Sequence, residues 1–161
     1  MSLLANMKEK NQQAKGSQSI YCGRMGIFIE PAEDTNINMK PYFMETKRLG
    51  FAKWRAGDID LATQLWGDEA VTRFICADGK FTSQDIINRL NTEIQNDQQF
   101  QIQYWPIFER SSHELVGCCG LRPFKDESAS YEIGFHLRQR FWGCGYASEA
   151  AQAVIDYGFS V

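Results

Sequence analysis

The chain has 161 residues, of which 43% are hydrophobic and 13% aromatic, enough for one globular domain with a core. Its net charge of -3 argues against a general nucleic-acid binder, because that function needs a basic face. No apolar run approaches the roughly 20 residues that span a membrane. The N-terminus lacks the apolar region of a secretory signal. We therefore expect a cytoplasmic protein that binds neither nucleic acid nor membranes.

The five cysteines are typical of free thiols in a reducing compartment, because their number is odd and none are spaced as C-x-x-C. Cys118 and Cys119 are adjacent in an apolar run. Successive side chains of a strand face opposite sides, so we expect these two thiols to be buried on opposite faces. The two histidines, His113 and His136, are too few for a histidine-rich metal site, and we expect no metal.

A polar N-terminal segment precedes the patterned part of the chain. Residues 1–19 are polar, and residues 20–30 contain an apolar triplet that favours a short strand. Residues 31–41 contain two prolines among Asn, Asp and Thr, which is typical of a linker. We therefore expect an N-terminal extension and linker over residues 1–42 and a folded domain over residues 43–161.

Hydrophobic spacing separates helices from strands in this domain, and Asp58 and Thr82 or Ser83 are suitable N-cap residues. The last helix is expected to bury Ala147, Ala151, Val154, Ile155 and Gly158. The predicted elements are a strand at 45–55, a helix after Asp58, a short helix at 68–74, a helix from 82 or 83 to about 96, a strand at 99–109, a turn at 111–114, a strand at 115–122, a turn at 125–128, a strand at 131–138 and a helix at 147–159.

The segment 140–150 is a glycine-punctuated loop that leads into the last helix. Gly143 and Gly145 allow the backbone to approach a bulky anion. The free N–H groups at a helix N-terminus and the positive end of its dipole favour phosphate, and Arg140 adds a cation. The segment therefore indicates a phosphate cradle, with a tight strand-to-helix turn as the alternative.

Four segments, 45–49, 115–121, 132–135 and 142–150, together resemble the GNAT acetyltransferases, especially the branch of the ribosomal-protein N-terminal acetyltransferases. The resemblance covers residues 45–161. The loop is similar to the family's acetyl-CoA motif, Q/R-x-x-G-x-G/A, as Arg140-x-x-Gly143-x-Gly145. Cys144 departs from the lysine or arginine that is often found between the glycines.

The resemblance implies an α+β fold, with a mixed but mostly antiparallel sheet flanked by helices, and acetyl-CoA as co-substrate. The loop amides would hold the diphosphate, and the edge of the preceding strand would pair with the pantetheine arm. The implied cofactor-binding residues are Phe135, Leu137, Arg138, Arg140, Gly143, Cys144, Gly145, Tyr146, Ala147 and Ser148.

The resemblance also implies an N-acetyltransferase in which a primary amine attacks the thioester directly. The acceptor is a protein N-terminus or a small amine. Such an amine is mostly protonated at neutral pH and needs a base. Glu132 is the first candidate, as base or water organiser, and His136 is the second. They are four residues apart on one face of a strand, roughly 13 Å, so they cannot both touch one amine.

Family members continue beyond the helix at 147–159 with a further strand, a helix and a closing hairpin. We therefore expect the C-terminal strands to be absent from this chain. The edge of the strand at 131–138 would then be unpaired, which favours a homo-oligomer. The alternative function is a non-catalytic CoA-binding or assembly module derived from the same fold.

Overall fold

The fold is built on a five-stranded sheet in the order β1-β2-β3-β4-β5, and every pairing in it is antiparallel. The computed structural model describes residues 40–124 and 130–160, within one unit, Asn38–Val161. The strands are β1 (Met44–Glu45), β2 (Leu49–Phe51), β3 (Tyr104–Glu109), β4 (Leu115–Pro123) and β5 (Tyr131–Leu137). The predicted N-terminal extension, apart from residues 40–42, and the predicted turn at 125–128 lie outside the described residues.

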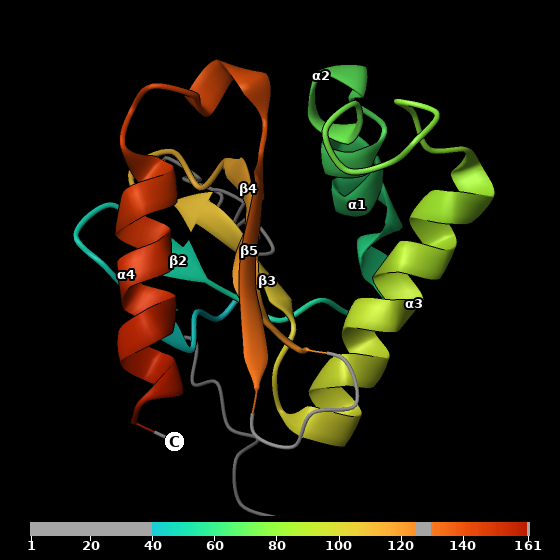
Figure 1. Cartoon of the computed structure of the whole chain (residues 1–161). Coiled ribbons are helices and arrows are strands. Elements are labelled where there is room, and N and C mark those ends of the chain that lie inside the picture. Colours follow the sequence, from blue (N-terminus) through green and yellow to red (C-terminus); the bar gives the residue numbers. More distant parts are fainter. Residues whose placement is uncertain (1–39, 125–129, 161) are drawn as a thin grey trace, which may run out of the picture. The chain divides into compact units, whose positions relative to one another are not determined.

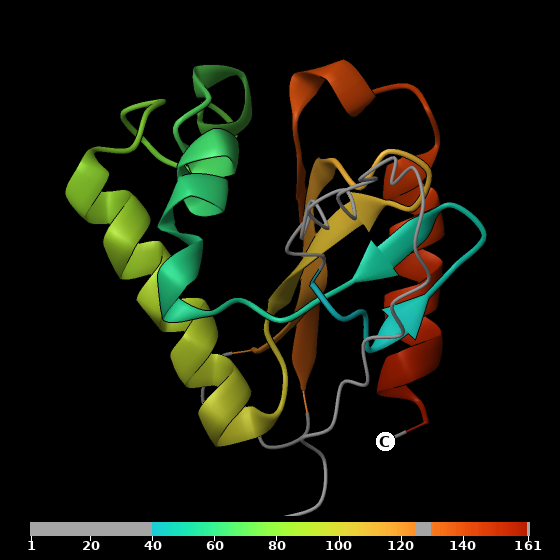
Figure 2. The same ribbon diagram turned by 180° about the vertical axis from the view of Figure 1, so that it is seen from behind.

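Helices cover both faces of the sheet, with α1–α3 on one face and α4 on the other (Figures 1 and 2). This arrangement confirms the predicted fold class of an α+β protein with a sheet between helices. The helical elements are η1 (Ala56–Asp58), α1 (Ile59–Trp66), α2 (Glu69–Thr72), α3 (Ser83–Phe100), η2 (Gln139–Phe141) and α4 (Tyr146–Gly158). Among the described residues no helix is long and apolar enough to cross a membrane.

Two hydrophobic clusters fill the spaces between the sheet and its helices. Leu137, Val154 and their neighbours form the cluster under α4, whereas Trp66, Leu90 and Tyr104 belong to the cluster under α1–α3. Adjacent residues of β4 divide between the two, since Cys118 belongs to the second cluster and Cys119 to the first. Both are free, buried thiols, as the strand alternation predicts, and burial raises both of their pKa values.

Three local predictions were wrong in detail. The predicted strand at 45–55 is a hairpin of β1 and β2, because the Thr46 side chain accepts a hydrogen bond from the Leu49 N–H at 3.0 Å and closes a turn. The predicted strand at 99–109 starts late, since α3 continues through Phe100 and ends at Gln101 with φ of 60°. On α4, Ile155 is 40% exposed, and the buried residues are Tyr146, Ala150 and Val154.

Candidate active site

The loop between η2 and α4 has the conformation that its glycines predict. Gly143 and Gly145 have φ values of 73° and 77°, in the left-handed region that glycine adopts without strain. Gly145 is the N-cap of α4, and no side-chain hydrogen bond caps this end of the helix. The first N–H groups of α4 therefore lack intrahelical partners and remain free for an anion.

A carboxylate in the first turn of α4 fastens this helix to the β1–β2 hairpin. Glu149 accepts hydrogen bonds from the Thr46 hydroxyl at 2.6 Å, the Arg48 backbone N–H at 2.9 Å and Arg48 Nε at 2.6 Å. Burial alone raises the pKa of Glu149, but these donors outweigh it and hold the pKa below its usual value. Two segments distant in the sequence, 45–49 and 142–150, are thus joined directly.

Arg48 also holds the glycine loop itself. Its Nη1 donates to the Cys144 carbonyl at 2.8 Å, and its guanidinium lies 4.4 Å from the centroid of the Tyr146 ring. The Tyr146 hydroxyl donates in turn to Glu109 at the end of β3. The loop is therefore positioned from both sides before any ligand binds.

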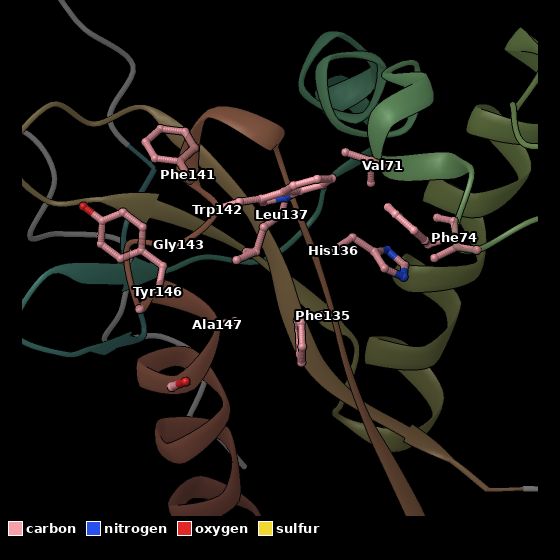
Figure 3. A pocket seen from close by; sticks show the side chains of 13 residues that line it. Val71, Phe74, Phe135, His136, Leu137, Phe141, Trp142, Gly143, Tyr146 and Ala147 are labelled. Carbon is pink, nitrogen blue, oxygen red and sulfur yellow. The ribbon is translucent and has the colours of Figure 1, made fainter.

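A pocket of about 580 Å³ joins this loop to the C-terminal half of β5 and to the end of α2 (Figure 3). Its apolar wall on the α2 side contains Val71, Phe74 and Ile75. Eight residues singled out from the sequence line it, namely Phe135, His136, Leu137, Gly143, Gly145, Tyr146, Ala147 and Ser148, together with Phe141 and Trp142.

The strand that lines the pocket presents an open backbone edge. Arg138 N–H donates to the Val116 carbonyl, and Leu137 is opposite Gly117 in the register. Hydrogen-bonded and non-bonded positions alternate in an antiparallel pair, so the N–H and C=O groups of Phe135 and Leu137 point away from β4. No described strand pairs with this edge, and Trp142 Nε1 donates to the Leu137 carbonyl at 2.7 Å.

The side chains of three predicted cofactor-binding residues lie outside the pocket lining. Arg140 forms an ion pair with Glu114. Arg138 Nη1 donates to the Leu115 carbonyl at 3.1 Å. Cys144 is exposed, and its thiol lies 3.6 Å from the Trp142 carbonyl. The candidate anion site therefore consists mainly of backbone groups.

The two candidate catalytic residues, Glu132 and His136, lie on the α1–α3 face of β5 and are linked by Tyr104. The Tyr104 hydroxyl donates to Glu132 Oε1 at 3.0 Å, and its ring centroid is 5.7 Å from that of His136 in an edge-on arrangement. A Cβ atom on Gly134 would overlap the Tyr104 phenol, so this glycine makes room for the tyrosine. Burial is the main reason that the pKa of Tyr104 is raised.

Sequence reasoning missed Tyr104, which it assigned only to a strand. The feature that could have indicated its role is the strand register, in which Tyr104 on β3 is opposite Gly120 on β4, and Gly120 is opposite Gly134 on β5. A large side chain beside two glycines in neighbouring strands has room to lie across them.

His136 is half-buried, and it contacts Trp66 on α1, Cys118 on β4 and Tyr104 on β3. Trp66 Nε1 on α1 donates to its Nδ1 at 3.1 Å, and the Cys118 thiol on β4 lies 3.6 Å from the same atom. Burial, followed by the positive charges of Arg89 and Arg122, lowers the pKa of His136 to about 3. The ring is therefore neutral across the physiological pH range.

Within residues 40–124 and 130–160, no group of three or more His, Cys, Asp or Glu side chains is placed to hold a metal ion. The described residues offer a candidate anion cradle, an open strand edge, a neutral imidazole and a carboxylate linked to a tyrosine.

Comparison with known proteins agrees with this description. A model of the acetyltransferase (GNAT) domain matches residues 48–161. The chain is 34% identical to an uncharacterized N-acetyltransferase, p20, from Bacillus licheniformis, over 71% of this chain and 65% of that protein. The crystal structure of a GNAT-family acetyltransferase from Bacillus anthracis is 29% identical with a TM-score of 0.60, over 73% of this chain and 66% of that one.

The fold also resembles that of RimL, a ribosomal L7/L12 α-N-protein acetyltransferase, in complex with coenzyme A. The TM-score is 0.59 at 15% identity, over 73% of this chain and 67% of that one. The chain belongs to the acetyltransferase (GNAT) domain family, which confirms the resemblance drawn from its sequence. It spans about two thirds of the length of these relatives.

Replacing Arg48 by Met should loosen the glycine loop, because the hydrogen bonds to Glu149 and Cys144 are lost while most of the chain length is kept. We expect acetyl-CoA affinity to fall on the order of tenfold, the scale of one hydrogen bond to a charged group. Titration calorimetry measures this. The matched control is Arg110→Met, which removes an arginine bonded to the same hairpin but not to the loop. If the acetyl-CoA affinity of Arg48→Met is within twofold of that of Arg110→Met, Arg48 does not hold the glycine loop for the ligand.

His136 should make the fold sensitive to acid. The unfolded chain takes up a proton near pH 6.5, whereas folded His136 does so near pH 3. Between these values the unfolded state binds more protons, so stability falls as pH decreases, by up to about 1.4 kcal/mol per pH unit. Urea unfolding of the wild type from pH 7 to 4.5 should show a steeper loss than His136→Gln. The control His113→Gln replaces a histidine exposed in the β3–β4 turn, and parallel curves for wild type and His136→Gln would refute the prediction.

Proposed function

We propose that this protein transfers an acetyl group from acetyl-CoA to a primary amine by direct attack of the amine on the thioester. The observation that carries the proposal is the continuity of the pocket. An uncapped helix N-terminus with its glycine loop leads directly to the open backbone edge of β5 at Phe135 and Leu137. A diphosphate and an extended amide-containing arm require these two surfaces, in that order.

The residues present fit such a ligand. At Gly143 no atom lies within 4 Å of the position that a Cβ would take, so the loop is open there and a side chain would obstruct it. The N–H groups at the start of α4 would hold the diphosphate. The N–H and C=O groups of Phe135 and the N–H of Leu137 would pair with the pantetheine amides, because the Leu137 carbonyl already accepts from Trp142 Nε1. Acetyl-CoA supplies an activated acyl group with a good leaving thiolate.

The protein's own contribution is mainly to orient two bound reactants. We assign Glu132 as the base, or as the organiser of a water that accepts the proton of the amine. The Tyr104 hydroxyl fixes one of its carboxylate oxygens. For the second, Oε2, the structure gives no hydrogen bond within the described residues.

The acceptor is a protein N-terminus or a small amine. RimL, which is named as an N-terminal acetyltransferase of L7/L12, shares the fold and favours the first class. We also assign residues 43–161 to the acetyltransferase domain and residues 1–42 to an extension. The free cysteines of the described part favour the cytoplasm as its compartment.

The cradle is tested by calorimetric titration of the full chain with acetyl-CoA. We expect micromolar binding that is lost in the Gly143→Asp/Gly145→Asp double variant, because the new carboxylates repel the diphosphate and strain the left-handed positions. The control is Gly79→Asp, which adds one such carboxylate and one such strained position, at φ of 71°, outside the pocket. Wild-type binding that survives the double substitution would remove the basis of the proposal.

Catalysis is tested by thiol release from acetyl-CoA with a peptide N-terminus, a polyamine and an aminoglycoside as acceptors. Glu132→Gln keeps an acceptor for Tyr104 but removes the base, so we expect a rate loss on the order of 10²- to 10⁴-fold with unchanged acetyl-CoA binding. Glu45→Gln, on exposed β1, is the control. Binding of acetyl-CoA without thiol release for any amine would favour the alternative, a non-catalytic CoA-binding module.

A further inference from the structure

The environment of His136 determines which ring nitrogen carries the proton. Nδ1 faces two groups, the Trp66 indole N–H and the Cys118 thiol. An indole is a donor only. The thiol is held in its protonated form by burial, which raises its pKa. Nδ1 must therefore be the unprotonated acceptor, and the single proton of the neutral ring is on Nε2.

The surroundings also oppose a second proton on the ring. An N–H on Nδ1 would point at the N–H of Trp66. The guanidinium groups of Arg89 and Arg122 stack on the neighbouring Tyr104 ring, at 5.4 and 4.3 Å from its centroid. The nearby carboxylates are engaged elsewhere, since Glu93 pairs with both arginines and Glu132 accepts from Tyr104, so neither is hydrogen-bonded to the imidazole.

Nε2 remains available to a ligand. It has no hydrogen-bond partner among the described residues, and it is not one of the fully buried polar atoms that lack a partner. His136 lines the pocket opposite the apolar side chains of α2, and its ring extends from β5 toward Phe74 (Figure 3). Nε2 can therefore meet a ligand that enters this pocket.

We propose that His136 is a neutral hydrogen-bond donor, fixed in its Nε2–H tautomer by Trp66, and that its partner is the acyl carbonyl oxygen of acetyl-CoA. The inference rests on the proposed function. An N–H donor would oppose attack if it faced the lone pair of the acceptor amine. The same N–H donor stabilises the acyl oxygen, because this oxygen gains negative charge as the amine attacks. His136 is therefore a donor, and the role of base belongs to Glu132.

The tautomer is tested first in the ligand-free protein, by the ¹⁵N resonances of the imidazole at pH 7. We expect one protonated nitrogen, Nε2, and one unprotonated nitrogen, Nδ1, with widely separated shifts that stay unchanged down to pH 5. In Trp66→Phe the two shifts should move toward each other. Trp54→Phe is the matched control, because its buried indole N–H donates to the Tyr104 carbonyl and not to His136. An Nδ1–H tautomer or an imidazolium in the wild type would overturn the inference.

The partner is tested by adding acetyl-CoA or S-ethyl-CoA, which has a similar size but lacks the acyl carbonyl. The Nε2–H resonance should shift with acetyl-CoA and not with S-ethyl-CoA. If both ligands bind and the resonance responds equally or stays unchanged, the donor role is wrong while the proposed function stands. If calorimetry shows that neither ligand binds, the donor role of His136 and the proposed function are both overturned.

Kinetics provide a separate readout. His136→Phe should lower kcat on the order of 10²-fold, the typical cost of one such donor, with little change in the KM for acetyl-CoA. His136→Gln, whose side-chain amide places an N–H at a similar distance from the backbone, should recover part of the loss. Equal losses in the two variants would contradict a donor role for the ring.

Discussion

The arrangement of the sheet face that carries Glu132 and His136 depends on one buried carboxylate, that of Glu93 on α3. It is fully buried, accepts the Tyr104 N–H at 2.8 Å and pairs with Arg89 and Arg122. A buried charge is tolerated only when it is paired and hydrogen-bonded. The same contacts fix the start of β3, the end of β4 and the middle of α3 relative to one another. Loss of the carboxylate would leave two guanidinium groups without compensation beside the tyrosine.

The position of Tyr104 then determines the surroundings of Glu132 and His136 on β5. Because its backbone is held by Glu93, its ring must cross two strands to reach Glu132, and only glycine at position 134 leaves that path open. The same ring covers one edge of His136. Tyr104 thus lies between the Glu132 carboxylate and the His136 imidazole, and the two groups have different surroundings. Glu132 is exposed as a potential base, whereas His136 is a half-buried neutral ring.

Local patterns predicted most of the fold and the glycine loop before α4. Period-2 and period-3.6 spacing, with glycine at 143 and 145, predicted β3–β5, the helices and the conformation of the glycine loop, because these features depend on neighbouring residues. The hairpin at Met44–Phe51 was missed, since its turn is closed by a Thr46 side chain that also bonds Glu149. The roles of Trp66, Tyr104 and Glu93 depend on contacts between residues far apart in the sequence, which periodicity does not contain.

Two carboxylates on opposite faces of the sheet thus divide the task of positioning the pocket. Glu149 ties the helix that presents the anion site to the β1–β2 hairpin, and Glu93 ties α3 to β3 and β4. The pocket lies along β5, where the two halves meet at residues 135–137. In the proposed complex, the ligand would touch one half through backbone amides and the other through the imidazole. Correct chemistry therefore requires both anchors, because a shift of either half would move its group relative to the other.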